Sequence, residues 1–239
     1  MIHKLTLIPL SPVLLFQGRH VRSSTVKLPE PEGARSGTVG EGPLLNMLLL
    51  GDSAVAGVGV EAQEDALSGQ LAQRLARRLT VNWTLQAHTG LKVSDFLPPA
   101  ERLPRIQVDV IVVSLGVNDV TSTVSASRWI RQVRQLVLAL QKQYRPKQIL
   151  FTAVPPMHRF PSLPQPLRWY LGQRARHFNH LLEALLDEHE KTELVTIDFA
   201  DDPAMMADDG FHPGRAGYIA WADTLAPLIL PADHSPSAT

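Results

Sequence analysis

The chain alternates between short apolar segments and longer amphipathic ones, and this alternation constrains the fold more than any other feature. Segments with the length and apolar character of buried strands are residues 44–50, 81–87, 108–115, 149–154 and 194–197. Strands that alternate with helices form crossover units. The chain is therefore predicted to be an α/β protein whose parallel sheet is covered by helices on both faces.

The spacing of apolar residues predicts helices between these strands. In the first helix, Leu67, Leu71, Leu75 and Leu79 recur every fourth residue. Further helices are expected over residues 127–140, 173–190 and 216–230. At 239 residues, of which 44% are hydrophobic, the chain can fill the core of one large domain.

Charge and cysteine content exclude several functional classes. The 23 Lys and Arg residues balance the 23 Asp and Glu residues, so no net charge favours nucleic acid as a partner. The chain has no cysteine, which excludes a disulfide framework, a thiol nucleophile and a thiolate metal site.

The first 43 residues differ in composition from the rest. Residues 5–16 are mostly apolar, but Pro9 and Pro12 interrupt them and no small-residue cleavage motif follows, so a cleavable signal peptide is not expected. The two prolines predict an extended arm that lies on the domain. The Pro-, Gly- and Glu-rich residues 28–43 predict a linker.

Three domain-level expectations follow. Residues 1–43 are an arm and linker, residues 44–230 are the catalytic domain, and residues 231–239 are a flexible tail. Basic residues close to the apolar segment are compatible with a peripheral membrane contact through residues 1–27. A cytoplasmic location is favoured, with membrane association as the alternative.

Ligands of parallel α/β sheets collect at the carboxyl ends of the strands, so the residues that follow each strand are candidates for a site. Four of the five expected strands are followed by glycine or polar residues. These segments are Gly51-Asp52-Ser53, His88-Thr89-Gly90, Gly116-Val117-Asn118-Asp119 and, across a loop, Asp209-Gly210-Phe211-His212.

Three of these side chains have the chemistry of a serine hydrolase. Ser53 is the candidate nucleophile, which needs a base to remove its proton. His212 is the candidate base, since an unperturbed imidazole titrates near neutral pH. Asp209, three residues earlier, can hold the imidazole in the required tautomer.

Acyl transfer also needs hydrogen-bond donors for the oxyanion. The backbone N–H groups of Ser53 and Gly90 and the side-chain amide of Asn118 are the candidates. The neighbouring acids Asp52 and Asp119 are expected to brace their loops by accepting hydrogen bonds from backbone N–H groups.

With these four segments in this order, the chain resembles the SGNH hydrolases, the family of GDSL-type lipases and esterases. The resemblance covers residues 44–230 and implies a three-layer, flavodoxin-like sandwich with about five parallel strands, no metal and no cofactor. It also implies hydrolysis of esters or thioesters, with a small ester or a lipid-like molecule as substrate. Ala54 replaces the leucine usual after Gly-Asp-Ser, which affects the shape of the pocket rather than the chemistry.

The proline-rich loop over residues 154–169 is a candidate wall of the substrate pocket. Met157, His158 and Phe160 are its candidate pocket residues. The alternative is a stiff surface loop that packs its own apolar side chains.

The sequence argues against several rival functions. Residues 57–62 fit a dinucleotide fingerprint formally but start too far after the strand, with no acid near residue 80. A metal-dependent phosphoesterase is disfavoured because Ser, Gly and Asn are poor metal ligands. A binding module without activity has little support because all the reactive groups are present. The prediction is a carboxylic ester hydrolase for short acyl chains, with a thioesterase or a carbohydrate acetylesterase as alternatives.

Overall fold

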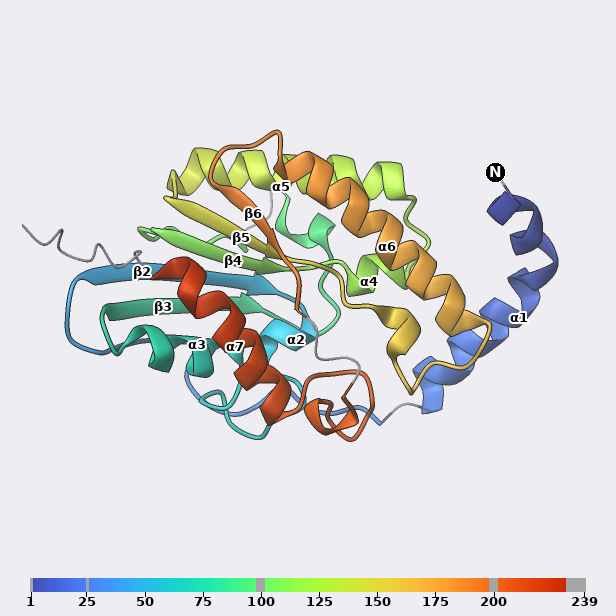
Figure 1. Cartoon of the computed structure of the whole chain (residues 1–239), viewed down its shortest axis with the longest axis horizontal. Helices are drawn as coiled ribbons and strands as arrows, with labels where there is room; N and C mark the ends of the chain where they lie inside the picture. The colour runs from blue at the N-terminus through green and yellow to red at the C-terminus, as the bar shows by residue number, and fades with distance from the viewer. Residues whose placement is uncertain (1, 25, 98–101, 198–201, 231–239) are drawn as a thin grey trace, which may run out of the picture.

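A six-stranded sheet forms the centre of the molecule in a computed structural model that describes residues 2–24, 26–97, 102–197 and 202–230, with side chains from residue 10 onward. Its strand order is β1-β3-β2-β4-β5-β6, and the labels in Figure 1 follow this order from β3 to β6. The strands are β1 (Ser36–Val39), β2 (Leu44–Gly51), β3 (Thr80–Ala87), β4 (Val110–Ser114), β5 (Gln148–Thr152) and β6 (Thr192–Val195).

Five of the six strands are parallel, and β1 pairs antiparallel with β3 at the edge. Counted along the chain, the parallel strands stand in the order 2-1-3-4-5, which is the flavodoxin-like arrangement. The α/β class and the parallel sheet expected from the sequence are confirmed. The sixth strand, β1, was not expected.

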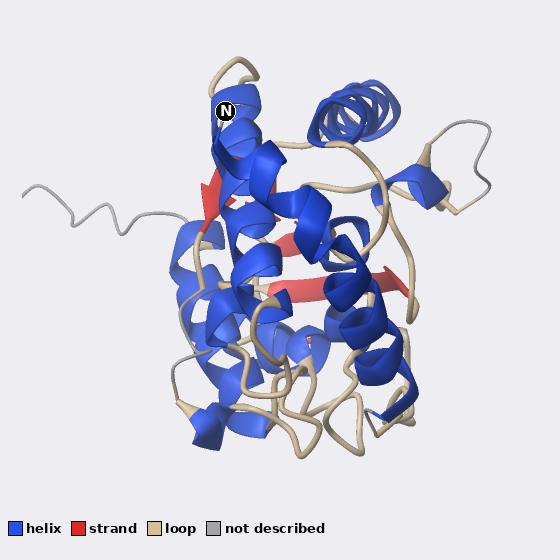
Figure 2. Ribbon diagram, turned by 90° about the vertical axis from the view of Figure 1, so that its right-hand side faces the viewer, coloured by secondary structure: helices blue, strands red, loops and turns tan. Residues whose placement is uncertain are grey.

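Helices cover both faces of the sheet, as Figure 2 shows from the end that carries α1. The helices are α1 (Ile2–Ser24), α2 (Ser53–Ala56), α3 (Leu67–Leu75), α4 (Val117–Val120), α5 (Ala126–Tyr144), α6 (Leu167–Leu186) and α7 (Arg215–Ile229). Short 3₁₀ turns are η1 (Val93–Phe96), η2 (Met157–Arg159) and η3 (Pro203–Met205). In the part of the chain that the structure describes, no helix is both long enough and apolar enough to cross a membrane.

Side chains that point alternately to the two faces of the sheet explain why helices cover both faces. In β2, Leu48 and Leu50 point into the core formed with α5 and α6, whereas Met47 and Leu49 point into the core formed with α3 and α7. All four side chains are at most 1% exposed. The continuous apolar run of β2 therefore fits a strand that is buried on both faces.

Some helix boundaries differ from those expected. Helix α6 begins at Leu167 instead of residue 173, because the helix continues through Arg168 and Trp169, whose polar and aromatic side chains gave no clear period. Helix α5 is capped by Ser125, whose Oγ accepts a hydrogen bond from the N–H of Arg128. The expected helix start at Ser127 was two residues late.

The prediction of an extended amino-terminal arm was wrong, because residues 2–24 form helix α1. A proline inside a helix removes one backbone hydrogen bond and crowds the preceding turn. Here Pro9 and Pro12 lie in the first half of α1, and the proline-free second half contains Leu14, Gln17 and Val21, which contact the domain. Leu14 and Val21 pack against the core on the side of α6. This tertiary contact compensates for the local cost.

The prediction of a linker over residues 28–43 was also wrong. Its residues 36–39 form β1 and pair with β3, and Glu32 forms a parallel bridge with Ala62. The Arg35 guanidinium donates to the carbonyl of Ala87 at the end of β3. The Pro and Gly content indicates low helix propensity. It does not indicate that residues 36–39 can pair with β3 at the edge of the sheet. The boundary at residue 44 stays a prediction, and the expected tail, residues 231–239, lies outside the described residues.

Candidate active site

The carboxyl ends of β2 and β4 form the switch point of the sheet. The register places Gly51 of β2 beside Ala87 of β3 on one side and Ser114 of β4 on the other. The connections that leave β2 and β4 lead to opposite ends of the sheet, which opens a crevice between them. The segments that follow β2, β3 and β4 therefore begin side by side, as expected from the sequence.

Ser53 is the first residue of α2, the turn directly after β2. Asp52 is the N-cap, and its Oδ1 accepts a hydrogen bond from the N–H of Ala54 at 3.2 Å. Gly57 ends the turn in the left-handed region, with φ 98°, and its N–H donates to the carbonyls of Ala54 and Ser53. The turn is capped at both ends, which fixes the position of Ser53.

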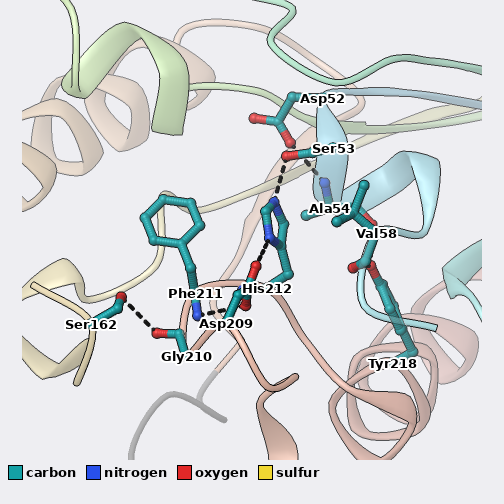
Figure 3. Close-up of polar contacts among 10 residues, drawn as sticks. All are labelled: Asp52, Ser53, Ala54, Val58, Ser162, Asp209, Gly210, Phe211, His212 and Tyr218. Carbon is teal, nitrogen blue, oxygen red and sulfur yellow. Dashed lines mark hydrogen bonds and ion pairs between the residues drawn. The ribbon is translucent and has the colours of Figure 1, made fainter. Parts of the chain in front are cut away.

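Tyr218 of α7 holds the same turn from the helical layer. Its hydroxyl lies 2.8 Å from the carbonyl oxygens of both Ala54 and Val58 and can donate to either (Figure 3). Burial raises the pKa of Tyr218 well above the usual value, so the hydroxyl keeps its proton. The role of Tyr218 could not be predicted from the sequence, because helical spacing places this residue in the core without indicating which turn it meets.

Asp209 and His212 form a compact loop before α7. The Asp209 Oδ1 accepts hydrogen bonds from the N–H groups of Phe211 and His212, each at 2.9 Å, and its Oδ2 lies 2.6 Å from His212 Nδ1. Burial alone would raise the pKa of Asp209, but the hydrogen bonds from His212 and Phe211 outweigh it and lower the pKa. Asp209 is therefore ionised at neutral pH. Its neighbour Asp208 is exposed, as expected for a loop charge.

The two segments meet at the imidazole. His212 Nε2 lies 2.8 Å from Ser53 Oγ, although the two residues are 159 positions apart in the sequence (Figure 3). With Asp209 on the other side of the ring, the proton on Nδ1 points at the carboxylate and Nε2 is left to accept the serine proton. Ser53, His212 and Asp209, predicted together from the sequence, thus form one continuous chain of hydrogen bonds.

Asn118 lies beside this chain, at the start of α4. Its Nδ2 donates to the carbonyl of Leu91 at 3.0 Å and to Asp52 Oδ2 at 3.4 Å. The second bond is long and correspondingly weak. The amide is therefore held close to the Ser53 turn, with one of its two donor hydrogens only loosely engaged.

Gly90 lies in the loop after β3 and is exposed. Its φ is 86°, and a Cβ at this position would meet no atom within 4 Å. The loop is held by the preceding residue, because the N–H of Thr89 donates to Glu30 Oε1 at 2.7 Å. The structure shows an open backbone here but no contact between Gly90 and Ser53. Glu30 was not singled out from the sequence, since it falls in the segment interpreted as a linker.

Asp52 and Asp119 brace the loops as expected. Asp119 accepts a hydrogen bond from the backbone N–H of Val93 at 3.3 Å, and Asp52 accepts one from the backbone N–H of Ala54 and one from the side-chain Nδ2 of Asn118. Both carboxyl groups are almost completely buried, which raises the pKa of each to about 6. The acid with a raised pKa that adjoins the candidate nucleophile is Asp52, whereas Asp119 adjoins Asn118.

A small cavity of about 50 Å³ opens beside Ser53 and His212. Its volume suits a few water molecules or an acyl group of few carbons. It is lined by Asp52, Ser53, Ala54, Ser114, Val117, Thr152, Ala153, Pro155, Phe160, Ile197, Phe211, His212, Pro213 and Trp221.

Of the three pocket residues expected from the proline-rich loop, only Phe160 lines this cavity. Its ring packs edge-on against Phe211, at 5.2 Å between centroids. Met157 is fully buried in the core beside α6, and the His158 side chain lies against Gly172 of α6. These two predictions were wrong, because the η2 turn directs residues 157 and 158 away from the catalytic edge.

A larger, open groove of about 560 Å³ lies at the amino ends of the strands, lined by residues such as Leu44, Lys147 and Lys191. It contains no serine and no histidine, so chemistry rather than size identifies the active site. Within the described ranges, no three His, Asp or Glu residues gather in a way that could hold a metal ion.

Comparison with known structures shows the same fold in several esterases. A psychrotrophic esterase from Pseudoalteromonas sp. matches with a TM-score of 0.62 and 17% identity, over 77% of this chain and 97% of that chain. A carbohydrate acetylesterase from Sinorhizobium meliloti matches with a TM-score of 0.56 and 20% identity, over 77% of this chain and 99% of that chain. An acetylxylan esterase from Geobacillus stearothermophilus matches with a TM-score of 0.55 and 18% identity, over 77% of this chain and 93% of that chain.

Identities this low show a shared fold alone. A comparison with curated proteins found no match. The family model for GDSL-like lipases and acylhydrolases matches residues 49–220, a span that includes Ser53, Asn118, Asp209 and His212. The chain therefore belongs to the GDSL-like lipase/acylhydrolase family and is a carboxylic ester hydrolase.

Proposed function

We propose that this ester hydrolase works through an acyl-enzyme on Ser53. His212 Nε2 takes the proton of Ser53 Oγ while the oxygen forms a bond to the acyl carbon. The tetrahedral intermediate collapses, the bond to the alcohol oxygen breaks, and His212 donates its proton to that oxygen. The hydrogen bonds of 2.8 Å and 2.6 Å on the two sides of the imidazole are the observation that carries this proposal.

The second half of the reaction reuses the same groups. His212 takes a proton from water, whose oxygen attacks the acyl carbon, and the proton returns to Ser53 as the acid leaves. Asp209 stabilises the imidazolium that forms in each half. Activity should fall in acid solution, because an imidazolium cannot accept a proton.

Three donors are assigned to the oxyanion in this proposal: the N–H groups of Ser53 and Gly90 and the Nδ2 of Asn118. The N–H of Ser53 lies in the first turn of α2, where helical N–H groups lack partners within the helix. The Asn118 Nδ2 can exchange its 3.4 Å contact with Asp52 for the oxyanion. The exposed, left-handed Gly90 leaves room for a substrate to approach its backbone.

The acyl group is proposed to be short, with acetyl as the best fit. The support is the volume of the cavity beside Ser53. At about 50 Å³ it is far smaller than the pockets of several hundred Å³ that hold larger ligands. Phe160 and Phe211 form its aromatic wall. Two of the similar structures are described as a carbohydrate acetylesterase and an acetylxylan esterase, which makes an acetylated sugar a candidate for the whole substrate.

The first experiment separates the function from its alternatives. The protein is incubated with a fluorophosphonate probe, and the labelled residue is located by mass spectrometry. Labelling of Ser53, abolished in Ser53→Ala and unaffected by a metal chelator, supports the acyl-enzyme. Absence of labelling together with loss of hydrolysis on adding chelator would support a metal-dependent phosphoesterase instead.

The second experiment identifies the substrate class. Hydrolysis of p-nitrophenyl esters from acetate to octanoate is measured beside acetylated xylo-oligosaccharides and acetyl-CoA. A preference for acetate over longer chains supports the proposed pocket. The leaving group with the highest kcat/KM then distinguishes an aryl esterase, a carbohydrate acetylesterase and a thioesterase.

Phe160→Ala tests the pocket wall directly. Removing the ring should raise the ratio of kcat/KM for butyrate over acetate by about tenfold or more, since one methylene changes discrimination by roughly 10–200-fold in apolar pockets. Met157→Ala is the control for the same loop, because its side chain lies in the core and not in the cavity. An unchanged ratio in Phe160→Ala would mean that acyl chains bind elsewhere.

A further inference from the structure

In the part of helix α1 whose side chains the structure describes, Leu14, Gln17 and Val21 attach one face of the helix to the domain. Leu14 and Val21 pack against the core beside α6. Gln17, between them, donates from Nε2 to the carbonyl of Gln165 at 2.7 Å and accepts the N–H of Leu167 at 3.1 Å. These contacts lie three and four residues apart, on one side of the helix, and they fix which face of α1 is turned to the solvent.

The solvent face of α1 is apolar to an unusual degree. Leu15 is 62% exposed and Phe16 is 72% exposed, which makes Phe16 the most exposed large hydrophobic side chain that the structure describes. Three of the nine such side chains in the described part of the chain, Val13, Leu15 and Phe16, belong to α1. A globular surface spreads such residues singly, whereas a cluster of them indicates a contact.

Arginines lie between these apolar side chains. With about 3.6 residues per turn, Arg19 falls between Leu15 and Phe16 on the face opposite Leu14, and Arg22 falls beside Leu15. Both arginines are exposed. The solvent face of α1 is therefore a mixed surface of apolar and cationic side chains.

The charge of this segment is the reverse of that of the body. Residues 1–29 contain four Lys or Arg residues and neither Asp nor Glu. Because the whole chain is neutral, the remaining residues carry a formal charge of −4. A surface that carries negative charge would attract the arm and repel the rest of the protein.

We propose that α1 binds the surface of an anionic lipid bilayer, with Leu15 and Phe16 inserted at the interface and Arg19 and Arg22 at the lipid phosphates. Apolar side chains flanked by arginines on one helix face are the features of helices that lie in the plane of a membrane surface. A second copy of the chain is a poorer occupant, because an antiparallel or parallel pair of these faces would bring arginines together. The inference concerns where the enzyme acts and is independent of the reaction at Ser53.

The position of α1 gives this contact a consequence for access to the active site. Gln165, which receives the bond from Gln17, ends the loop that carries Phe160 into the cavity. In Figure 1, α1 and the carboxyl ends of the parallel strands lie toward the same end of the molecule. A bilayer bound by α1 would face this end.

The test is co-sedimentation of the full-length protein with vesicles. One set contains phosphatidylcholine alone, and the other contains one third phosphatidylglycerol, at ~0.02 M and ~0.5 M salt. The wild type should bind the anionic vesicles at low salt and be largely released at high salt. Arg19→Gln with Arg22→Gln should weaken binding about 25-fold, since each cation near such a surface contributes about fivefold. Leu15→Ser with Phe16→Ser should reduce it at both salt concentrations.

Matched controls come from helix α5. Arg128→Gln with Arg131→Gln removes two exposed arginines at the same spacing, and Leu138→Ser removes an exposed leucine. Both should bind as the wild type does, and all variants should hydrolyse a soluble ester at the wild-type rate. The proposal would be overturned if the wild type stayed in the supernatant, or if the α1 variants bound as tightly as the wild type. A dimer in light scattering that Phe16→Ser converts to monomer would assign the face to a second copy instead.

Discussion

Two side-chain amides, each making two hydrogen bonds, hold two very different regions of the molecule. Asn118 lies at the catalytic edge and bonds Leu91 and Asp52 among buried groups. Gln17 lies in α1 and bonds the backbone of Gln165 at the surface and that of Leu167 in a partly buried position. The bond lengths do not separate them, since those of Gln17 are, if anything, shorter.

The difference lies in what surrounds each amide. At the catalytic edge Asp209 is held by the N–H groups of Phe211 and His212 and by the imidazole, and the turn that carries Ser53 is capped at both ends. Helix α1 is held on one face by two apolar side chains and one amide. Removing a group from the catalytic edge should therefore affect chemistry strongly, whereas removing one from α1 should affect attachment weakly.

The largest effect is expected for the reacting groups. Ser53→Ala and His212→Ala should each lower kcat by about 10⁴–10⁶-fold, because the residues of such a chain act as a unit. Hydrolysis of p-nitrophenyl acetate measures the loss, and the melting temperature should stay within a few degrees of the wild type. Ser23→Ala in α1 removes a hydroxyl that bonds only the carbonyl of His20 and should leave kcat unchanged. Equal losses in Ser53→Ala and Ser23→Ala would remove the distinction between the two regions.

Asn118→Ala should have the second largest effect. It should lower kcat by about 10²–10³-fold if its amide supplies a donor to the oxyanion. The loss should appear in kcat rather than in KM, because the charge on the oxygen develops only in the transition state. Steady-state kinetics on a short acyl ester separate the two parameters. A change confined to KM would assign Asn118 to substrate binding.

Asp119→Asn tests the electrostatics of the catalytic edge through stability. Burial raises the pKa of Asp119 from 3.8 to about 6, so between these values the folded state binds more protons than the unfolded state. Stability contributed by the protonated group is then lost as the pH rises from about 4 to about 6, by on the order of 2–3 kcal/mol. The free energy of unfolding of the wild type minus that of Asp119→Asn should fall by this amount over that window. A difference that does not vary with pH would show that the carboxyl titrates alike in both states.

Gln17→Ala should have the smallest effect. It removes one exposed and one partly buried hydrogen bond and should cost about 1 kcal/mol in the attachment of α1. Limited proteolysis should cleave between α1 and the sheet sooner than in the wild type, while kcat on a soluble ester stays within twofold. A loss of kcat comparable to that of Asn118→Ala would mean that the two regions are mechanically coupled.

The sequence was sufficient for the catalytic edge because its chemistry needs particular residue types at strand ends. Ser53, Asp209, His212 and Asn118 are polar residues placed where apolar segments stop, and a parallel sheet brings such positions to one edge. It was insufficient for Met157, His158 and Tyr218. Whether a loop residue points into a cavity or into the core depends on the path of the backbone, and periodicity carries no information about that path.

The amino-terminal region shows the same limit of prediction from local sequence. Local rules for proline and glycine predicted an extended arm and a linker, and the structure has a helix and an edge strand. Residue by residue, those rules describe only the local cost of a conformation. Stability also comes from contacts with groups far away in the chain. Examples are the packing of Leu14 and Val21 on the core and the pairing of residues 36–39 with β3.

The sequence by itself determined the fold class, the family and the reacting groups, because these depend on patterns that each segment carries alone. Only the tertiary structure decided that His212 reaches Ser53 at 2.8 Å, that the cavity beside them is small, and that α1 turns Phe16 outward. These features depend on the relative placement of segments separated by up to 159 residues. Packing fixes that placement through contacts that no single segment contains.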